Sequence, residues 1–140
     1  MLENIKAYLH RAQERRKAYL AGRRGNVYTI EHDVHELRLS WLTLENDRGA
    51  LVVSWKDIVR LEAFKRDCFT VDLICLAICL QNKTEIEINE EMNGWEPLMR
   101  RLPEYLPGCI NFDKWYDVVA QPPFKENLTV IYRRLPEPHR

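Results

Sequence analysis

Residues 31–36 form a short run of side chains that could bind a metal ion or transfer protons. The run reads Glu-His-Asp-Val-His-Glu, with two imidazoles and three carboxylates in six residues. Such groups hold a divalent ion when they converge on one point. The zinc-protease motif needs histidines four residues apart, whereas His32 and His35 are three apart and on a strand would point to opposite faces. The pattern therefore favours a polar turn leading into a hairpin, and we predict no metal site.

Nucleophilic or acid–base catalysis is the second chemistry that the residue types allow. A cysteine beside a histidine can act as a nucleophile, and the chain has four of each. It has no C-x-x-C pair, no G-x-S-x-G elbow and no glycine-rich phosphate loop. We therefore predict no cofactor and no catalytic residue, and keep an enzyme with a site near Asp67, Asp72 and a cysteine as the alternative. The cysteines are Cys68, Cys75, Cys79 and Cys109.

Asp72 is the one acid within a long apolar run, which extends from Phe69 to Leu80. An unpaired carboxylate in a protein interior costs several kcal/mol. If this run pairs with residues 58–64 and the charged residues after them, Lys65 lies nearly opposite Asp72. We therefore predict a structural ion pair between Lys65 and Asp72.

Aromatic and acidic side chains in the second half of the chain are candidates for contact with another protein. Trp115 and Tyr116 precede the loop Pro122-Pro123-Phe124, and aromatic side chains dominate the binding energy of interfaces. The alternative is that Trp115 and Phe124 close the end of the sheet. A strand over residues 85–89 has one hydrated face, and its acids would meet a basic partner. The acids of this predicted surface are Glu85, Glu87, Glu90 and Glu91.

The elements that position these groups follow from the hydrophobic period. Alternating residues predict strands, and a three-to-four-residue period after Gly94 predicts helices. Pro103 should kink or end the first of these helices, and Asp113 should cap the second. Because strands and helices are segregated along the chain, we predict an α+β fold with an antiparallel sheet of about five to six strands packed against C-terminal helices. The expected strands are 27–30, a hairpin over 37–55, 58–64, 69–80, 85–89 and 128–132.

The first 24 residues differ from the rest in charge. They carry seven cations and two anions, a net +5, while the remaining 14 cations and 19 anions give −5. Apolar residues from Leu2 to Tyr19 predict a basic amphipathic helix that ends near Gly22. We therefore divide the chain into this helix, residues 1–24, and one α+β domain, residues 25–140. The helix could pack on the domain, form a homo-oligomer through residues 2–20, or lie on an anionic membrane.

Length and composition restrict the class of protein. A chain of 140 residues with 46% hydrophobic residues is one globular domain with a real core. Zero net charge and an acidic domain argue against nucleic-acid binding. The apolar stretch Val71–Leu80 contains Asp72 and is too short to span a bilayer. With no secretion signal at residues 1–11, we expect a cytoplasmic protein with reduced thiols.

Several motifs between residues 50 and 135 resemble those of a group of small proteobacterial proteins of uncharacterised activity. They are W-x-D-I from Trp55, A-F-K-R-D from Ala63, E-I-N-E-E from Glu87 and P-P-F-x-x-N-x-T from Pro122. The resemblance implies a bacterial source and no particular chemistry. The run of strands followed by a helix also resembles a pleckstrin-homology-like roll, although the segment after the helix departs from that pattern.

Together these features favour a non-catalytic domain that binds another protein. One concrete form is a bacterial immunity protein, which neutralises a toxin by covering a basic surface with its own acidic one. A small enzyme and a homo-oligomerising structural protein are the alternatives.

Overall fold

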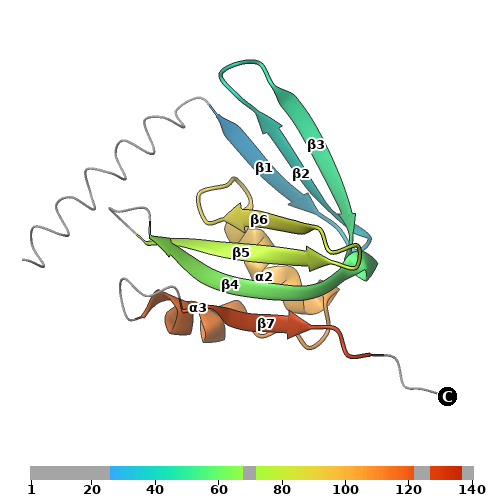
Figure 1. Cartoon of the computed structure of the whole chain (residues 1–140), viewed down its shortest axis with the longest axis vertical. Coiled ribbons are helices and arrows are strands. Elements are labelled where there is room, and N and C mark those ends of the chain that lie inside the picture. The colour runs from blue at the N-terminus through green and yellow to red at the C-terminus, as the bar shows by residue number, and fades with distance from the viewer. Residues whose placement is uncertain (1–25, 68–71, 122–126, 137–140) are drawn as a thin grey trace, which may run out of the picture.

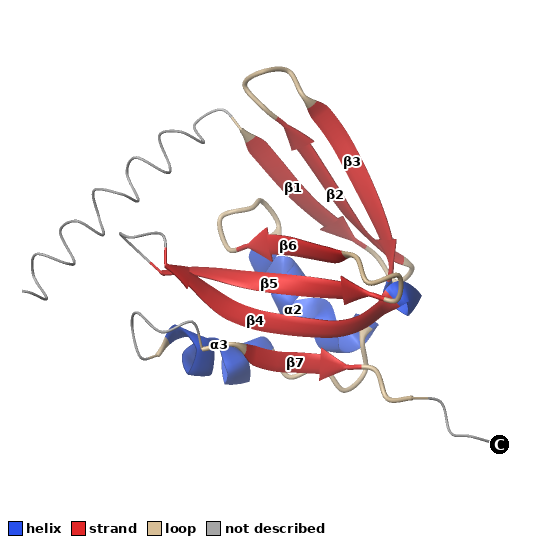
Figure 2. Ribbon diagram, in the orientation of Figure 1, coloured by secondary structure: helices blue, strands red, loops and turns tan. Residues whose placement is uncertain are grey.

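The computed structural model describes residues 26–67, 72–121 and 127–136 (Figure 1). The predicted N-terminal helix, Cys68 and Phe124 lie outside these residues. Seven strands, two α-helices and a short 3-10 helix follow one another, so the α+β class is confirmed (Figure 2). The elements are β1 (Val27–His32), β2 (Glu36–Leu42), β3 (Arg48–Ser54), η1 (Trp55–Asp57), β4 (Ile58–Asp67), β5 (Asp72–Leu80), β6 (Glu85–Asn89), α2 (Trp95–Tyr105), α3 (Phe112–Ala120) and β7 (Thr129–Arg133).

The strands form two antiparallel sheets, where the sequence predicted one. The first has the order β1-β2-β3 and the second β6-β5-β4-β7. The division falls at η1, where Trp55 is buried and the chain turns, so that β4 pairs with β5 instead of β3. The hydrophobic pattern of a strand does not specify which sheet the strand joins.

β5 is the central strand that the apolar run predicted. It pairs with β4 on one side and β6 on the other, and its seven interior residues are buried on both faces. One face, with Ile74, Leu76 and Ile78, contacts the main core, which also includes residues of both helices and of the three-stranded sheet. The other face carries a smaller cluster, which consists of Phe64, Leu73, Cys75 and Ala77.

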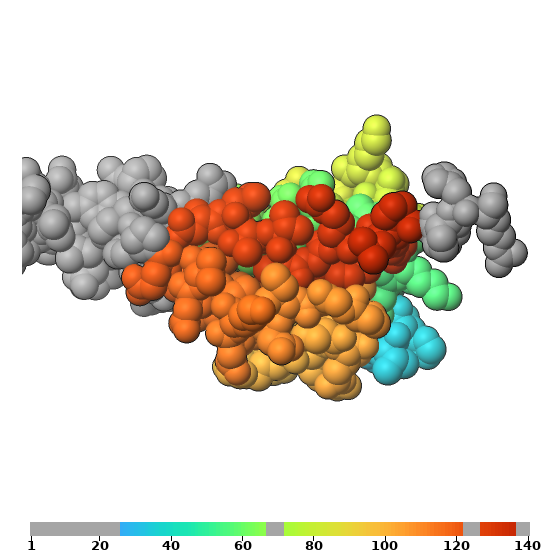
Figure 3. All heavy atoms as spheres, turned by 90° about the horizontal axis from the view of Figure 1, so that it is seen from below, coloured from blue at the N-terminus to red at the C-terminus, as the bar shows by residue number. Residues whose placement is uncertain are grey.

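Both helices cover the core face of the four-stranded sheet. Leu98, Met99 and Leu102 of α2 and Trp115 and Val119 of α3 are buried there. Seen from below, the two helices (orange) lie beside β7 (red) (Figure 3). Within the described residues, no helix has the length and apolar character needed to cross a bilayer.

The predicted cap of α3 at Asp113 was wrong, and α2 ends two residues beyond Pro103. α2 continues through Pro103 to Tyr105, because the proline removes one backbone bond near the end while Leu102 and Leu106 remain buried. In α3 the N-cap residue is Asn111, and Asp113 lies in the first turn, where its charge suits the helix dipole.

Candidate functional site

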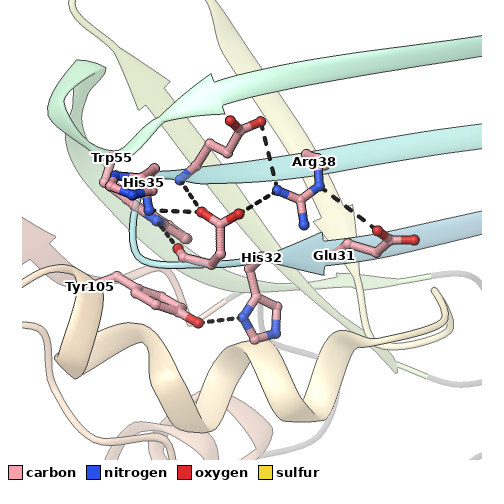
Figure 4. Close-up of polar contacts among 8 residues, drawn as sticks. Glu31, His32, His35, Arg38, Trp55 and Tyr105 are labelled. Atoms are coloured by element: carbon pink, nitrogen blue, oxygen red, sulfur yellow. Dashed lines mark hydrogen bonds and ion pairs between the residues drawn. The ribbon is translucent and has the colours of Figure 1, made fainter.

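The run at residues 31–36 forms a polar network around Asp33 (Figure 4). One carboxylate oxygen of Asp33 accepts hydrogen bonds from the backbone N–H groups of His35 at 2.8 Å and Glu36 at 3.0 Å. The other accepts from Nη1 of Arg38 at 2.7 Å, and this bond is the largest cause that lowers the pKa of Asp33 to about 2. Asp33 therefore stabilises the β1–β2 turn as a carboxylate and is a poor general base.

His32 connects this network to α2 (Figure 4). Its Nδ1 lies 2.7 Å from the hydroxyl oxygen of Tyr105. The Tyr105 ring stacks on the Trp55 ring, with the two ring centroids 4.6 Å apart. The Trp55 indole N–H donates to the carbonyl oxygen of Asp33 at 2.7 Å. Burial, followed by the charges of Arg101 and Arg38, lowers the pKa of His32. His35 is exposed and joins this network through its backbone N–H, and the described residues contain no group of three or more side chains arranged to hold a metal ion.

Lys65 and Asp72 lie close together at the core face of the four-stranded sheet. The Lys65 Nζ is 3.3 Å from Oδ2 of Asp72, and the two side chains are 2% and 17% exposed. The register pairs Asp72 with Asp67, so Lys65 reaches Asp72 diagonally. Lys65 also donates to the carbonyl oxygen of Ala120, the last residue of α3, at 3.0 Å. The ammonium group thus holds β4, β5 and the end of α3 together.

Among the described residues of the alternative enzyme site, Asp72 lies apart from Cys75 and Cys79, while Cys68 and the side chain of Asp67 lie outside the described part of the chain. Because neighbouring residues on a strand alternate, Asp72 points to the core face of β5, whereas Cys75 and Cys79 point to the opposite face. Cys109 is buried, and burial raises the pKa of its thiol to about 12. Burial likewise raises the pKa of Cys79 despite the nearby guanidinium of Arg60. These raised values disfavour the nucleophilic thiolate.

An open acidic groove of about 800 Å³ lies between the β6–α2 connection and the two helices. Its walls are the β6–α2 connection, the first turns of α2 and the exposed side of α3. Five carboxylates and a single guanidinium line it, together with the rings of Phe112 and Tyr116. The charged lining residues are Glu90, Glu91, Glu96, Arg100, Asp113 and Asp117.

Backbone contacts fix the wall of this acidic groove that follows β6. The carboxylate of Glu90 accepts from the N–H of Ile74 at 3.1 Å, and the N–H of Glu90 donates to the carbonyl of Ile74 at 3.0 Å. Farther along, Asn93 exchanges backbone bonds with β1, accepting from Ile30 at 2.7 Å and donating to Tyr28 at 3.0 Å. The wall is therefore attached to both sheets.

Arg100 bridges the two helices on the other side of the acidic groove. Its guanidinium donates to Glu96 at 2.9 Å and to Asp113 at 3.2 Å, and lies over the Phe112 ring at 5.2 Å. Next to it, burial together with the charges of Glu90 and Asp117 raises the pKa of Tyr116. Tyr116 therefore keeps its hydroxyl proton and offers a hydrogen-bond donor among carboxylates.

The predicted contact residues have different positions in the structure. Glu90, Glu91 and Tyr116 lie together in the acidic groove, but Trp115 is 1% exposed and belongs to the core, as the alternative reading held. Glu85 and Glu87 project from the opposite face of the sheet, opposite Cys79 and Ala77 in the register.

The sequence predicted Tyr116 as a contact residue but not the charged helix residues of this groove, which are Glu96, Arg100, Asp113 and Asp117. The sequence feature that indicates these residues is a four-residue spacing, Glu96 with Arg100 and Asp113 with Asp117. This spacing places each pair on one side of its helix. Nothing in that spacing indicates that the two sides face one another.

Comparisons with models of known protein families, with curated proteins and with solved structures found no match. The resemblances to a proteobacterial group and to a pleckstrin-homology-like roll therefore stay predictions.

Proposed function

We propose that this protein is a non-catalytic binding domain whose acidic groove receives a basic segment of another protein. The observation that carries the proposal is the lining: five carboxylates against one guanidinium, with the rings of Trp95, Phe112 and Tyr116, in an open groove of about 800 Å³. A cationic side chain gains from the carboxylates and from the faces of the rings.

Arg100 indicates which cation suits these walls. Its guanidinium is held by two carboxylates and an aromatic ring that all line the acidic groove. A partner arginine would find the same kinds of group in Asp117 and the ring of Tyr116. A planar guanidinium bonds carboxylates in pairs and stacks on rings, so we expect arginine to be preferred over lysine.

The most specific form of this proposal is an immunity protein that neutralises a toxin. A toxin domain that acts on nucleic acid needs a cationic surface for the phosphates. An acidic groove that covered this surface would block access to the nucleic acid without any chemistry of its own. In this form of the proposal, arginines of the toxin lie against the acidic groove.

The test measures the binding of a fluorescent nona-arginine peptide by anisotropy at about 20 mM and about 200 mM salt. The double variant Asp113→Asn/Asp117→Asn removes two charges from the acidic groove. The matched control, Glu45→Gln/Asp47→Asn, removes two charges from the exposed β2–β3 turn. Exposed ion pairs contribute up to about 1 kcal/mol each, so the groove variant should weaken binding by about threefold to tenfold.

The control variant should bind as the wild type does, and nona-lysine should bind more weakly than nona-arginine. Equal binding by the groove and control variants would contradict the proposal, because the attraction would then come from the surface as a whole. Recovery of this chain alone in a low-salt co-purification from its native host would count against the toxin form.

A further inference from the structure

Two antiparallel sheets leave four edge strands, and three of them are protected. The edge of β1 exchanges backbone bonds with Asn93, and the carbonyl of Ile131 in β7 accepts from the N–H of Ile110 at 2.9 Å. β6 is short and carries exposed Glu85 and Glu87. Covering segments and charged side chains of this kind keep edge strands from pairing with other chains.

The fourth edge, β3, has none of these features. It is seven residues long, Arg48–Ser54, and Arg48 is its one charged residue. Its register with β2 is regular throughout, without a bulge, and β2 supplies all of its backbone partners in the described part of the chain. Leu51 is 38% exposed and Val52 is 58% exposed, so both faces of the strand present apolar side chains.

The face of the three-stranded sheet that contacts the core stays apolar as far as the β3 edge. Leu37 and Val53 are buried, whereas farther along the same face Trp41 is half-buried next to β3. A Cβ atom at Gly49 would lie 2.0 Å from the Trp41 ring, so the indole lies directly on the glycine. The apolar surface therefore reaches Leu51 without interruption by a charged group.

We propose that a second copy of this chain pairs with β3 in antiparallel orientation, so that the two three-stranded sheets form one six-stranded sheet across a two-fold axis. The strand is compatible with itself in this arrangement. With Leu51 on the axis, Ala50 faces Val52, Gly49 faces Val53 and Arg48 faces Ser54. The two Arg48 charges then lie at opposite ends, whereas a parallel pairing would set them side by side.

The symmetry of this pairing explains why we assign the edge to a second copy. An antiparallel pair uses the same strand of both chains, so the contact closes at a dimer and leaves no further open β3 edge. The main-chain bonds supply affinity that depends little on sequence, and the apolar pairs fix the register. The proposal is independent of the acidic groove, which lies at the helices.

The test is the solution mass of the full chain by light scattering from about 5 µM to about 200 µM. The wild type should approach twice its 16.7 kDa mass as the concentration rises. Val52→Lys places a charge on the outer face beside the two-fold axis and should raise the dissociation constant by at least about tenfold. Val118→Lys is the matched control, because Val118 of α3 is also 58% exposed, and it should leave the dimer unchanged.

Far-UV circular dichroism of both variants checks that they are folded. A wild type that stays monomeric at the highest concentration would overturn the proposal. So would a dimer that Val52→Lys leaves intact, since the contact would then lie elsewhere, for example in residues 2–20. Assemblies larger than a dimer would also overturn it, because the two-fold pairing closes.

Discussion

At the scale of single residues, Lys65 shows why a charge can be retained in this core. Its ammonium group contacts the carboxylate of Asp72 and the final carbonyl of α3, so it satisfies two acceptors from different elements. A cation at the C-terminal end of a helix also opposes the negative end of the helix dipole. Removing either charge therefore takes away an ion-pair partner of a group that lies in the protein interior.

Asp72→Ala should therefore lower the free energy of unfolding by about 3 kcal/mol or more, because the Lys65 charge stays buried. Urea denaturation followed by tryptophan fluorescence measures the loss. The double variant Lys65→Met/Asp72→Leu, which removes both charges, should lose less than Asp72→Ala alone. A melting curve that Asp72→Ala leaves unchanged would show that the ion pair contributes nothing.

His32 makes the stability depend on pH. Its lowered pKa means that the folded protein binds a proton less readily than the unfolded chain does. The free energy of unfolding should thus be constant above the ordinary histidine pKa and fall as the pH drops from about 7.5 to about 5.5. The charged groups around the imidazole account for the lowered pKa of His32, because Arg101 and Arg38 oppose its protonation and Asp33 favours it.

Urea denaturation at several pH values measures this dependence, and His32→Gln should flatten it. His35→Gln is the control, since His35 is exposed in the same turn. Unaltered pH dependence in His32→Gln would assign the effect to another group. The Asp33 carboxylate, with a pKa of about 2, stays ionised over the whole range.

At the scale of elements, Gly94 decides how the β6–α2 connection meets β1. Its φ of +90° is left-handed, and a Cβ atom there would lie 2.3 Å from the backbone oxygen of Ile30. Gly108 has a similar φ of +95°, but a Cβ atom at that position would meet nothing within 4 Å. A side chain at position 94 would therefore meet both an unfavourable φ and a steric clash, whereas one at position 108 would meet the unfavourable φ alone.

Gly94→Ala should destabilise the protein by about 3 kcal/mol or more, since strain and collision act together. Gly108→Ala should cost only about 1 kcal/mol, the strain alone. Thermal and urea denaturation of both variants give the comparison. Equal losses would mean that the connection can move away from β1, and the wall of the acidic groove would then be less rigid than its backbone bonds indicate.

The elements themselves could largely be predicted from the sequence, because period and breaker residues act locally. The alternation from Leu37 to Trp41 and the doubly apolar run before Leu80 both correspond to observed strands. The turn at Trp55 and the passage of α2 through Pro103 could not be predicted, since each depends on burial against distant elements. The acidic groove could be predicted only in part for the same reason: Glu90, Glu91 and Tyr116 were predicted as contact residues, but the helix carboxylates join them only through the tertiary fold.

At the scale of the whole molecule, the net charge of zero is a sum over surfaces that differ locally in charge and polarity. The acidic groove lies at the helices, while the open edge of β3 lies in the other sheet. Long-range attraction of a basic partner would therefore come from the local field of the acidic groove, which salt screens within about 10 Å. Pairing through β3 would be almost insensitive to salt, because its contacts are main-chain bonds and apolar side chains.

Hydrogen exchange measured at two protein concentrations tests whether a second copy of the chain covers the β3 edge. Amides of β5 should exchange slowest at both concentrations, because the strand is flanked by β4 and β6 and buried on both faces. The amides of β3 that point away from β2 should slow as the dimer forms, by about fivefold when the total chain concentration is about ten times Kd. β6 is the internal control, since it is also an edge strand but carries charged residues, and its exchange should not change with concentration. Exchange in β3 that is equally fast at both concentrations would show that its edge stays open to solvent, and the acidic groove would then be the better supported of the two surfaces.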